Sequence, residues 1–256
     1  MSEAILEMQN VEKRFGGVRA IDQFSLKVEP GMIYGLIGPN GAGKTTIFNT
    51  ITGIYQADGG RILFQGKNIT KIEPHEAAHL GIARTFQNIR LFGNLSVKTN
   101  VMISCNMHSK YHLGDALLRT PRYREATKET EDRAMEFLDI VGLADKGEER
   151  ASSLPYGHQR KLEIARAMAT DPKLLLLDEP AAGMNADESL ELVEFIRELK
   201  QRFDITILMI EHHMDVVTNL CDACTVLNFG KTLATGTVEE IKKNPEVIAA
   251  YLGGDE

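Results

Sequence analysis

A glycine-rich loop between an apolar run and a helix-prone segment constrains this sequence more than any other feature. Residues 33–38 read IYGLIG and lead directly into GPNGAGKTT at 38–46, which has the pattern G-x-x-x-x-G-K-T. The glycines of such a loop let successive backbone N–H groups face phosphate oxygens, and the helix start behind them favours an anion. The pattern therefore predicts a strand, a phosphate-binding loop and a helix within an α/β fold.

The polar residues of this loop have distinct expected tasks. Lys44 is expected to reach the β and γ oxygens of a nucleotide, and Thr45 to offer its hydroxyl to Mg²⁺. The alternative is a glycine turn without a ligand, which the strand-loop-helix context disfavours. The expected nucleotide-binding residues of the loop are Gly38, Asn40, Gly41, Ala42, Gly43, Lys44, Thr45 and Thr46.

Two acidic residues follow a second apolar run. The stretch LLLLDE at 174–179 reads as a buried strand that ends in Asp178. Asp178 is placed to hold the Mg²⁺ shell of a phosphate-loop enzyme, and the carboxylate after it, Glu179, can accept a proton from an attacking water. Taken alone, the two acids could simply end a strand. Beside the phosphate-binding loop, they predict a metal ligand and a general base.

The remaining apolar runs are of two kinds. The first kind alternates with helical patterns and predicts a parallel sheet with helices on its faces, at 33–38, 173–180, 205–212 and 223–230. The second kind alternates polar with apolar residues and predicts a separate antiparallel sheet joined by tight turns such as EPG and ADGG, at 4–11, 24–28 and 61–66. No repeat or proline- or glycine-rich linker divides the 256 residues, which favours a single composite domain.

Charge and hydropathy exclude several classes of protein. The formal net charge of −7 opposes nonspecific binding to nucleic acid or anionic lipid. No window reaches about 18 consecutive apolar residues, and the start MSEAILEMQN lacks a long apolar core. Neither a signal peptide nor a spanning helix is expected. We therefore expect a cytosolic chain, or one that reaches a membrane only through a partner.

Two motifs suggest metal or redox chemistry that the rest of the sequence does not support. Cys221 and Cys224 form a CxxC, but a structural zinc site needs four ligands and no second pair exists, so we expect these thiols, like Cys105, to pack in the interior. The stretch HEAAH at 75–79 matches a zinc-protease pattern. It has no obvious third ligand downstream, and Pro74 before it favours a short surface helix.

A further stretch, LPYGHQRKLEIARA at 154–167, places a glycine at the start of a basic amphipathic helix. It resembles the signature of the ABC-transporter ATPases, and Gln87 in RTFQN and His212 in MIEHHMD then match the glutamine loop and the histidine switch of that family. The phosphate loop, glutamine, signature, acidic strand and histidine follow one another in the family's order over some 180 residues. This order is far more specific than any single motif.

The resemblance implies a role for the signature residues. In the family, two ATPase chains meet head to tail, and the signature of one chain closes over the γ-phosphate bound to the other. Leu154 and Gly157 retain the family pattern, whereas Pro155, Tyr156 and His158 depart from its LSGGQ, and Asn185 stands near the place where the family often has aspartate.

The remaining carried-over roles concern the nucleotide itself. Phe15 in KRFGGVRA matches the aromatic residue that stacks on adenine, although a core phenylalanine is the alternative. Gln87 would reach the metal or the attacking water, which makes it both a catalytic and a metal-contacting candidate. His212 would hydrogen-bond the γ-phosphate and hold Glu179 in line. ATP and Mg²⁺ are the cofactors that this reading implies.

Closeness to one subfamily extends over most of the chain. Stretches such as GPNGAGKTTIFNTITGIY, RTFQNIRLFGNLSV and PEVIAAYLG look like the ATPase subunit of high-affinity branched-chain amino acid importers. The resemblance implies membrane-spanning permease subunits, a second ATPase chain of the same or a paralogous kind, and indirectly a solute-binding protein. It also implies a peripheral position on the inner face of the cell membrane. A lipopolysaccharide exporter ATPase, a non-transport ABC ATPase and a nucleotide switch without turnover are the alternatives.

The resemblance also implies a domain plan. We expect residues 1–256 to form one ABC-type ATPase domain with a mixed or parallel core sheet and an antiparallel β subdomain, a helical subdomain inserted at about 88–160, and a C-terminal helical extension at about 236–256. The charged stretch 120–143 is expected to form a surface helix. Phe86, Ile89, Leu91 and Phe92 precede a helix start at Ser96, and they either receive a short helix of a membrane subunit or belong to the core of the helical subdomain.

Overall fold

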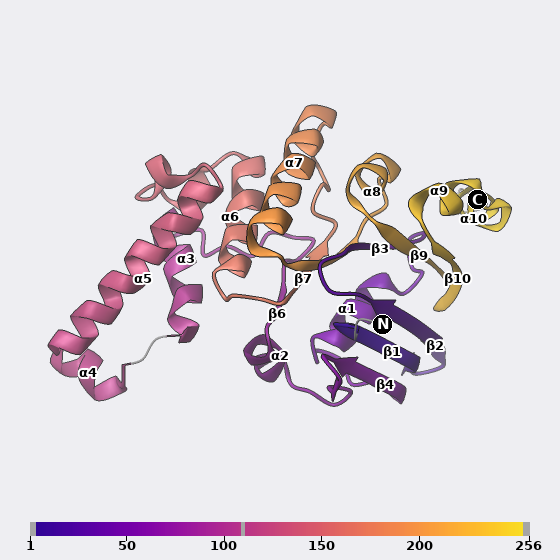
Figure 1. Ribbon diagram of the computed structural model, residues 1–256, viewed down its shortest axis with the longest axis horizontal. Helices are drawn as coiled ribbons and strands as arrows, with labels where there is room; N and C mark the ends of the chain where they lie inside the picture. Colours follow the sequence, from indigo (N-terminus) through magenta and orange to yellow (C-terminus); the bar gives the residue numbers. More distant parts are fainter. Residues whose placement is uncertain (1–3, 109–110, 253–256) are drawn as a thin grey trace. The chain divides into compact units, whose positions relative to one another are not determined.

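The computed structural model of the protein describes residues 4–108 and 111–252 (Figure 1). The chain divides into two compact units. The first comprises residues 1–87 and 173–256, and the second comprises residues 88–172. The second unit is thus inserted in the sequence between two halves of the first.

The first unit is built around a six-stranded sheet with the strand order β10-β9-β3-β8-β7-β6. The strands are β3 (Ile33–Ile37), β6 (Ile82–Arg84), β7 (Leu174–Asp178), β8 (Thr206–Ile210), β9 (Ala223–Asn228) and β10 (Lys231–Gly236). β6, β7, β8, β3 and β9 run parallel, and only β10 is antiparallel to its neighbour. The four apolar runs expected in a parallel sheet are all strands of it, so this part of the fold prediction is confirmed. The three-residue β6 was not expected.

A second, antiparallel sheet of the first unit has the order β2-β1-β4-β5. Its strands are β1 (Leu6–Phe15), β2 (Val18–Val28), β4 (Gly59–Phe64) and β5 (Lys67–Asn68). The expected separate antiparallel sheet is therefore present, but neither expected turn joins two of its strands. Residues 57–60 lead into β4 from the segment that follows the helix at 44–51. Glu29, Pro30 and Gly31 lead from β2 into β3 of the other sheet, whereas β1 and β2 are joined at Gly16 and Gly17.

The helices of the first unit are α1 (Lys44–Ile51), α2 (Pro74–Leu80), α7 (Ala186–Phe203), α8 (Met214–Leu220), α9 (Val238–Lys243) and α10 (Pro245–Leu252). Four of them, α1, α7, α8 and α9, directly follow strands of the larger sheet, whereas α2 follows β5 of the smaller sheet and α10 follows α9. One apolar cluster joins Ile47 and Phe48 of α1 to Phe24 of the antiparallel sheet and Leu36 and Leu208 of the parallel sheet. Because the buried face of α1 packs in this cluster, the start of the helix is held firmly where β3 ends.

The regular elements of the second unit are all helices in its described residues. Its helices are α3 (Val97–Cys105), η1 (Asn106–His108), α4 (Leu113–Leu118), α5 (Pro121–Ile140), η2 (Ala144–Lys146), η3 (Ala151–Ser153) and α6 (Tyr156–Met168). Its core includes Val101 of α3, Leu138 of α5 and Leu162 of α6. The expected surface helix is α5, which begins after the side-chain cap of Thr120 and leaves most of its charged residues exposed.

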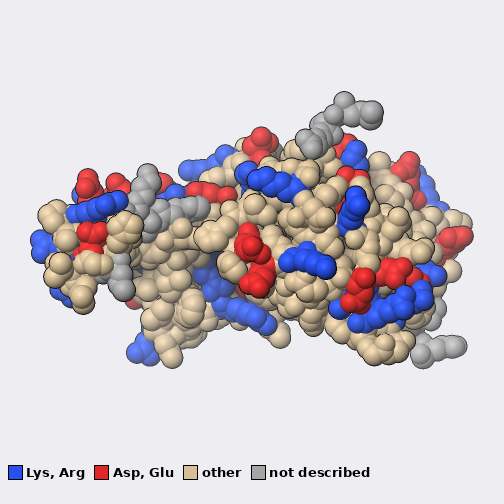
Figure 2. Space-filling view, turned by 90° about the horizontal axis from the view of Figure 1, so that it is seen from below, with Lys and Arg blue, Asp and Glu red and all other residues tan. Residues whose placement is uncertain are grey.

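The described surface carries charged side chains of both signs. None of the helices in the described ranges is long and apolar enough to cross a membrane. Figure 2 shows Lys and Arg side chains lying next to Asp and Glu side chains on the face that it draws. The mixture of signs on that face accords with the net charge of −7.

Candidate nucleotide site

The glycine-rich loop adopts a backbone that only glycine tolerates at its two ends. Gly38 has φ 148° and a Cβ there would lie 2.1 Å from the carbonyl oxygen of Leu227. Gly43 has φ 107° and a Cβ there would lie 2.4 Å from the carbonyl oxygen of Ala20. The loop is therefore packed directly against neighbouring backbone, which fixes the path of the chain from β3 into α1.

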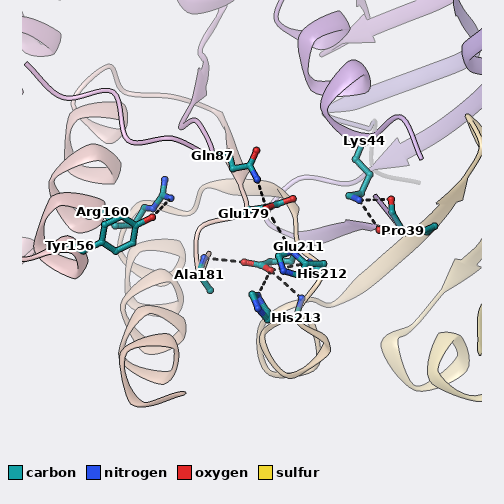
Figure 3. Close-up of polar contacts among 11 residues, drawn as sticks. Pro39, Lys44, Gln87, Tyr156, Arg160, Glu179, Ala181, Glu211, His212 and His213 are labelled. Atoms are coloured by element: carbon teal, nitrogen blue, oxygen red, sulfur yellow. Dashed lines mark hydrogen bonds and ion pairs between the residues drawn. The ribbon is translucent and has the colours of Figure 1, made fainter. Parts of the chain in front are cut away.

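Lys44, the first residue of α1, points its ammonium group back into the loop (Figure 3). Its Nζ donates hydrogen bonds to the carbonyl oxygens of Gly38, at 2.7 Å, and of Pro39, at 2.9 Å. Burial lowers the pKa of Lys44, and the carboxylates of Glu179 and Asp178 oppose this effect. The cation is thus held within the loop by acceptors that a phosphate could replace.

A cavity of about 390 Å³ opens over this loop. The residues that line it are Val18, Arg19, Ala20, Asn40, Gly41, Ala42, Gly43, Lys44, Thr45, Thr46, Gln87, Glu179, Phe229 and Gly230. The structure therefore brings most of the expected loop residues together with Gln87 and Glu179. The cavity is the natural place for the phosphates of a nucleotide, because loop amides and one ammonium group surround it.

The turn between β9 and β10 lines the cavity, and the sequence reasoning missed it. Phe229 and Gly230 both have positive φ, of 44° and 79°. The N–H of Gly230 donates to the carbonyl oxygen of Ala42 at 2.8 Å, and its carbonyl oxygen accepts from the N–H of Asp22 at 2.9 Å. The turn is thereby tied to the loop, while the Phe229 side chain remains 84% exposed. The sequence shows two turn residues between two expected strands, but it does not show that this turn lies against the glycine-rich loop.

Asp178 ends β7 as expected, and it is buried beside an arginine that the sequence reasoning did not use. Arg84 of β6 donates from Nη2 to Asp178 Oδ2 at 2.7 Å and from Nη1 to Asn49 Oδ1 at 2.6 Å. Because both partners are almost fully buried, each charge needs the other. The pair fixes the carboxyl end of β7 relative to α1.

Oxygen donors for a divalent cation are available at this site. Thr45 is exposed at the start of α1, and it lines the cavity together with Gln87, which carries an amide oxygen. Asp178 is buried outside the cavity lining, and its Oδ2 is held by Arg84. A set of hydroxyl, carboxylate and amide oxygens is what Mg²⁺ prefers, so these residues fit that ion. Their role as ligands stays a prediction.

Glu179 lies between three segments of the first unit. Its backbone has φ 46°, a left-handed conformation that is uncommon for a residue with a Cβ, and its N–H donates to the carbonyl oxygen of Ile210 at 2.9 Å. Gln87 Nε2 donates to Glu179 Oε2 at 2.8 Å, and His212 Nδ1 lies 3.8 Å from the same oxygen (Figure 3). The three catalytic candidates of the sequence are therefore brought together, although their roles stay a prediction.

A buried carboxylate that the sequence reasoning overlooked, Glu211, lies next to this group. It forms with His212 and His213 the one group of three potential metal ligands found among residues 4–108 and 111–252. Both oxygens of Glu211 already accept hydrogen bonds, from the N–H groups of Ala181, His212 and His213. The cluster is therefore built as an internal hydrogen-bond network rather than as an open set of ligands.

Phe15, the residue expected to stack on adenine, lies in the first unit. Its side chain is 43% exposed at the end of β1, so the alternative of a core phenylalanine is wrong. The ring lies edge-on to Tyr55 with a centroid separation of 5.0 Å, and Lys13 Nζ lies 5.4 Å from its centroid. Such a half-exposed, flanked ring is suited to stacking on a base.

The signature residues lie in the second unit. Pro155 is the N-cap of α6, Leu154 before it is buried, and Gly157 lies in the first turn. A Cβ at Gly157 would meet no atom within 4 Å, so its backbone is open to an approaching group. Arg160, fully buried, donates to Glu163 at 2.8 Å and to the hydroxyl of Tyr156 at 3.3 Å, which anchors the tyrosine that replaces a family glycine (Figure 3).

Comparison with known proteins decides the family. The family model described as ABC transporter matches residues 21–182, and the model described as branched-chain amino acid ATP-binding cassette transporter matches residues 231–256. The chain belongs to the ABC transporter family. The resemblance noted in the sequence is thereby confirmed, and so is the expected ABC-type α/β fold.

Relatives of this ABC protein share its full length. It is 45% identical to the high-affinity branched-chain amino acid transport ATP-binding protein LivG of Escherichia coli (strain K12), over 99% of both chains. It is 43% identical to the corresponding protein BraF of Pseudomonas aeruginosa, again over 99% of both. A crystal structure of the ADP conformation of an ATP-binding cassette of an ABC transporter matches with a TM-score of 0.86 at 34% identity, covering 98% of this chain and 100% of that one.

The residues expected to receive a membrane subunit are only partly buried in this ABC protein. Phe92 is 50% exposed, and Arg166 lies over its ring with 5.7 Å between the guanidinium carbon and the centroid. The buried side chain of Asn100 accepts from the Phe92 N–H at 2.9 Å and donates to its carbonyl oxygen at 3.1 Å. A core position is therefore wrong for Phe92, and the loop that presents it is firmly held.

The two motifs that suggested metal or redox chemistry have structural explanations. Glu76 of HEAAH accepts from the N–H of Glu73 at 2.9 Å as part of a capping box at α2, and His75 and His79 are exposed on that short helix. Burial raises the pKa of Cys224 to about 11 and raises that of Cys221 further. The Sγ of Cys221 and the Cβ of Cys224 lie against Gly35 of β3, with Cys224 buried and Cys221 half-buried.

Proposed function

We propose that this ABC protein binds and hydrolyses ATP and thereby powers an importer of branched-chain amino acids. One observation carries the hydrolytic part of the proposal. Glu179, with Gln87 hydrogen-bonded to it, lines the same cavity as Lys44 of the phosphate-binding loop. A carboxylate beside the place of the phosphates can take a proton from water as the water attacks.

The residues have separate tasks in this proposal. The loop amides and Lys44 bind the β and γ phosphates, and Phe15 stacks on adenine. Thr45 and Asp178, with Gln87 nearby, would hold Mg²⁺, which would neutralise phosphate charge. Glu179 accepts the proton of the attacking water. His212 hydrogen-bonds the γ-phosphate and holds the Glu179 carboxylate in line.

The proposed assembly extends beyond one chain. Two ATPase chains pair head to tail, so that Leu154 and Gly157 of one chain close over the nucleotide of the other. We propose that the two units form one ATPase domain with a helical subdomain and a C-terminal helical extension, peripheral to the inner face of the cell membrane and bound to permease subunits. A solute-binding protein acts on the other side, and nucleic acid is not a partner. The solute class rests on the names of the relatives LivG and BraF.

Two measurements test the proposal in separate parts. Purified full-length chain should release phosphate from ATP in the presence of Mg²⁺, and Lys44→Ala should abolish this release, because it removes the ammonium group from the phosphates. A folded parent protein without any release would end the ATPase proposal. The membrane subunits that co-purify with the chain should then support ATP-dependent uptake of leucine, isoleucine or valine into vesicles. Uptake of an unrelated solute alone would leave the ATPase but overturn the solute class.

A further inference from the structure

We propose that Glu211 is a positioning residue that holds the switch histidine, His212, and the segment after Glu179 in one fixed arrangement. The proposal rests on the proposed hydrolytic function, because it assigns Glu211 a task in keeping that site aligned. In this proposal Glu211 acts by holding neighbouring backbone N–H groups. Its own side chain contacts neither the phosphates nor the attacking water.

The side chain of Glu211 connects two segments that are distant in the sequence. It follows β8 directly and is fully buried. One oxygen, Oε1, accepts from the N–H of Ala181 at 3.0 Å, and the other, Oε2, accepts from the N–H groups of His212 at 3.0 Å and His213 at 3.3 Å (Figure 3). Ala181 lies two residues after Glu179. One carboxylate therefore binds both the segment that follows Glu179 and the segment that carries His212.

A second connection joins the same two segments. The N–H of Glu179 donates to the carbonyl oxygen of Ile210 at 2.9 Å, one residue before Glu211. The backbone bond and the carboxylate together leave Glu179 and His212 little freedom to separate, and His212 Nδ1 lies 3.8 Å from Glu179 Oε2. The His213 ring supports the arrangement, since its Nδ1 lies 3.2 Å from Glu211 Oε2 and its centroid lies 4.0 Å from that of His212.

Only a carboxylate satisfies this arrangement. Three backbone N–H groups point at Glu211 from opposite sides, and a carboxylate offers acceptors in every direction. A glutamine has the same shape, but its NH₂ would face either the N–H of Ala181 or those of His212 and His213. At least one buried donor would then lose its partner and meet another donor, which forces one of the two segments to move.

The test compares two carboxylate-to-amide changes in the full-length chain. Glu211→Gln should lower kcat for Mg²⁺–ATP about ten- to hundredfold, as expected when catalytic groups are slightly misplaced, while the Kd for ATP changes less than about twofold. Asp222→Asn is the matched control, because Asp222 Oδ2 likewise accepts from a backbone N–H, that of Ile33 at 2.8 Å, outside the cavity. The control should keep the parental kcat even if its melting temperature falls.

A double-mutant comparison separates positioning from general damage. In single-turnover measurements, the losses from Glu211→Gln and His212→Ala should combine less than additively, because part of the Glu211 effect passes through His212. Full additivity of the two losses would overturn the proposal, as would a Glu211→Gln kcat no lower than that of Asp222→Asn. If the parent chain hydrolyses ATP but these variants do not behave as expected, the Glu211 proposal is wrong and the proposed ATPase function is unaffected.

Amide exchange tests the geometry without any variant. In the parent chain, the amide hydrogens of Ala181, His212 and His213 should exchange slowly, because each is bound to a buried carboxylate. This measurement can overturn the proposal even if Glu211→Gln does not fold. Rapid exchange of these three amides, beside slow exchange of the strand amides of β8, would overturn the proposal.

Discussion

The side-chain amide of Gln87 donates a hydrogen bond of 2.8 Å to Oε2 of Glu179. Gln87 is also the last residue of the first unit before the chain passes into the second at Asn88. The proposed general base is therefore hydrogen-bonded to the residue at one of the two covalent connections between the units, the other being at residues 172 and 173. A movement of the chain at residue 88 would act directly on the partner of Glu179.

This hydrogen bond makes Glu179→Gln an informative change. The amide oxygen can still accept from Gln87, so the loop should keep its shape and ATP should bind as in the parent. The amide cannot take a proton, so the rate of phosphate release should fall about a hundredfold or more, in line with the usual contribution of a general base. Steady-state phosphate release and the ATP-dependent dimer fraction measure the two effects. Glu188→Gln, in the exposed capping box of α7, is the control. Near-normal hydrolysis by Glu179→Gln would remove Glu179 from the base role.

Phe92→Asp should separate the nucleotide site from the contact with the membrane subunits. Because Phe92 is 50% exposed, the substitution should change the free energy of unfolding by less than about 1 kcal/mol and spare ATP hydrolysis by the isolated chain. Binding to the permease subunits should weaken, since a charge would enter an apolar contact. Co-purification and thermal melting check these outcomes. Phe203→Asp, a similar change at a side chain 37% exposed on α7, should leave permease binding intact. Equal binding by both variants would refute the docking role.

The cysteines should behave as inert interior thiols. Burial raises the pKa of Cys105 and of Cys224 to about 11 in each case, so at pH 8 only about one thiol in a thousand is the reactive thiolate. Raising the pH toward 11 should speed alkylation by iodoacetamide, because it increases the thiolate fraction. Mass spectrometry should find Cys105, Cys221 and Cys224 slowly modified in the folded chain at pH 8 and rapidly modified in denaturant. Fast modification of Cys221 or Cys224 in the folded chain would revive the redox reading of the CxxC.

Two inactive variants test whether the signature acts on the nucleotide of a second chain. Lys44→Ala removes a charge from the bound phosphates, and Gly157→Asp adds a negative charge where the opposing γ-phosphate must approach. A Cβ at Gly157 meets no atom within 4 Å, so Gly157→Asp should fold and its monomer should bind ATP as the parent does. In a mixed dimer both lesions fall in one site, and the other site is intact. Mixing should therefore recover up to about a quarter of the parental rate, for statistical pairing and independent sites.

The affinity of the Gly157→Asp monomer for ATP is the deciding measurement of that experiment. Coupling between the two sites could suppress recovery in the mixture without affecting the monomer. A large loss of monomer affinity would mean that Gly157 serves the site of its own chain, and the head-to-tail assignment would then fall.

Most strands of the larger sheet could be predicted because buried parallel strands are short, continuous apolar runs. β3, β7 and β8 are each buried along their whole length, so their residue types alone distinguish them. β6 has only three residues and carries Arg84, which makes it unlike such a run. The turn at Glu29 to Gly31 was assigned to the wrong pair of strands, because a turn motif marks where a chain bends but not which strand it enters.

The chemistry of the loop and the family could be read from the order of the residues alone. The spacing of Gly38, Gly43, Lys44 and Thr45 depends on local backbone geometry, and local geometry can be read from consecutive residues. What surrounds that loop became visible only in the folded chain. The Arg84–Asp178 pair, the turn at Phe229 and the carboxylate of Glu211 act between segments far apart in the chain. Such contacts depend on how strands are ordered in the sheet and on which polar groups burial forces to find one another, and neither follows from the pattern of neighbouring residues.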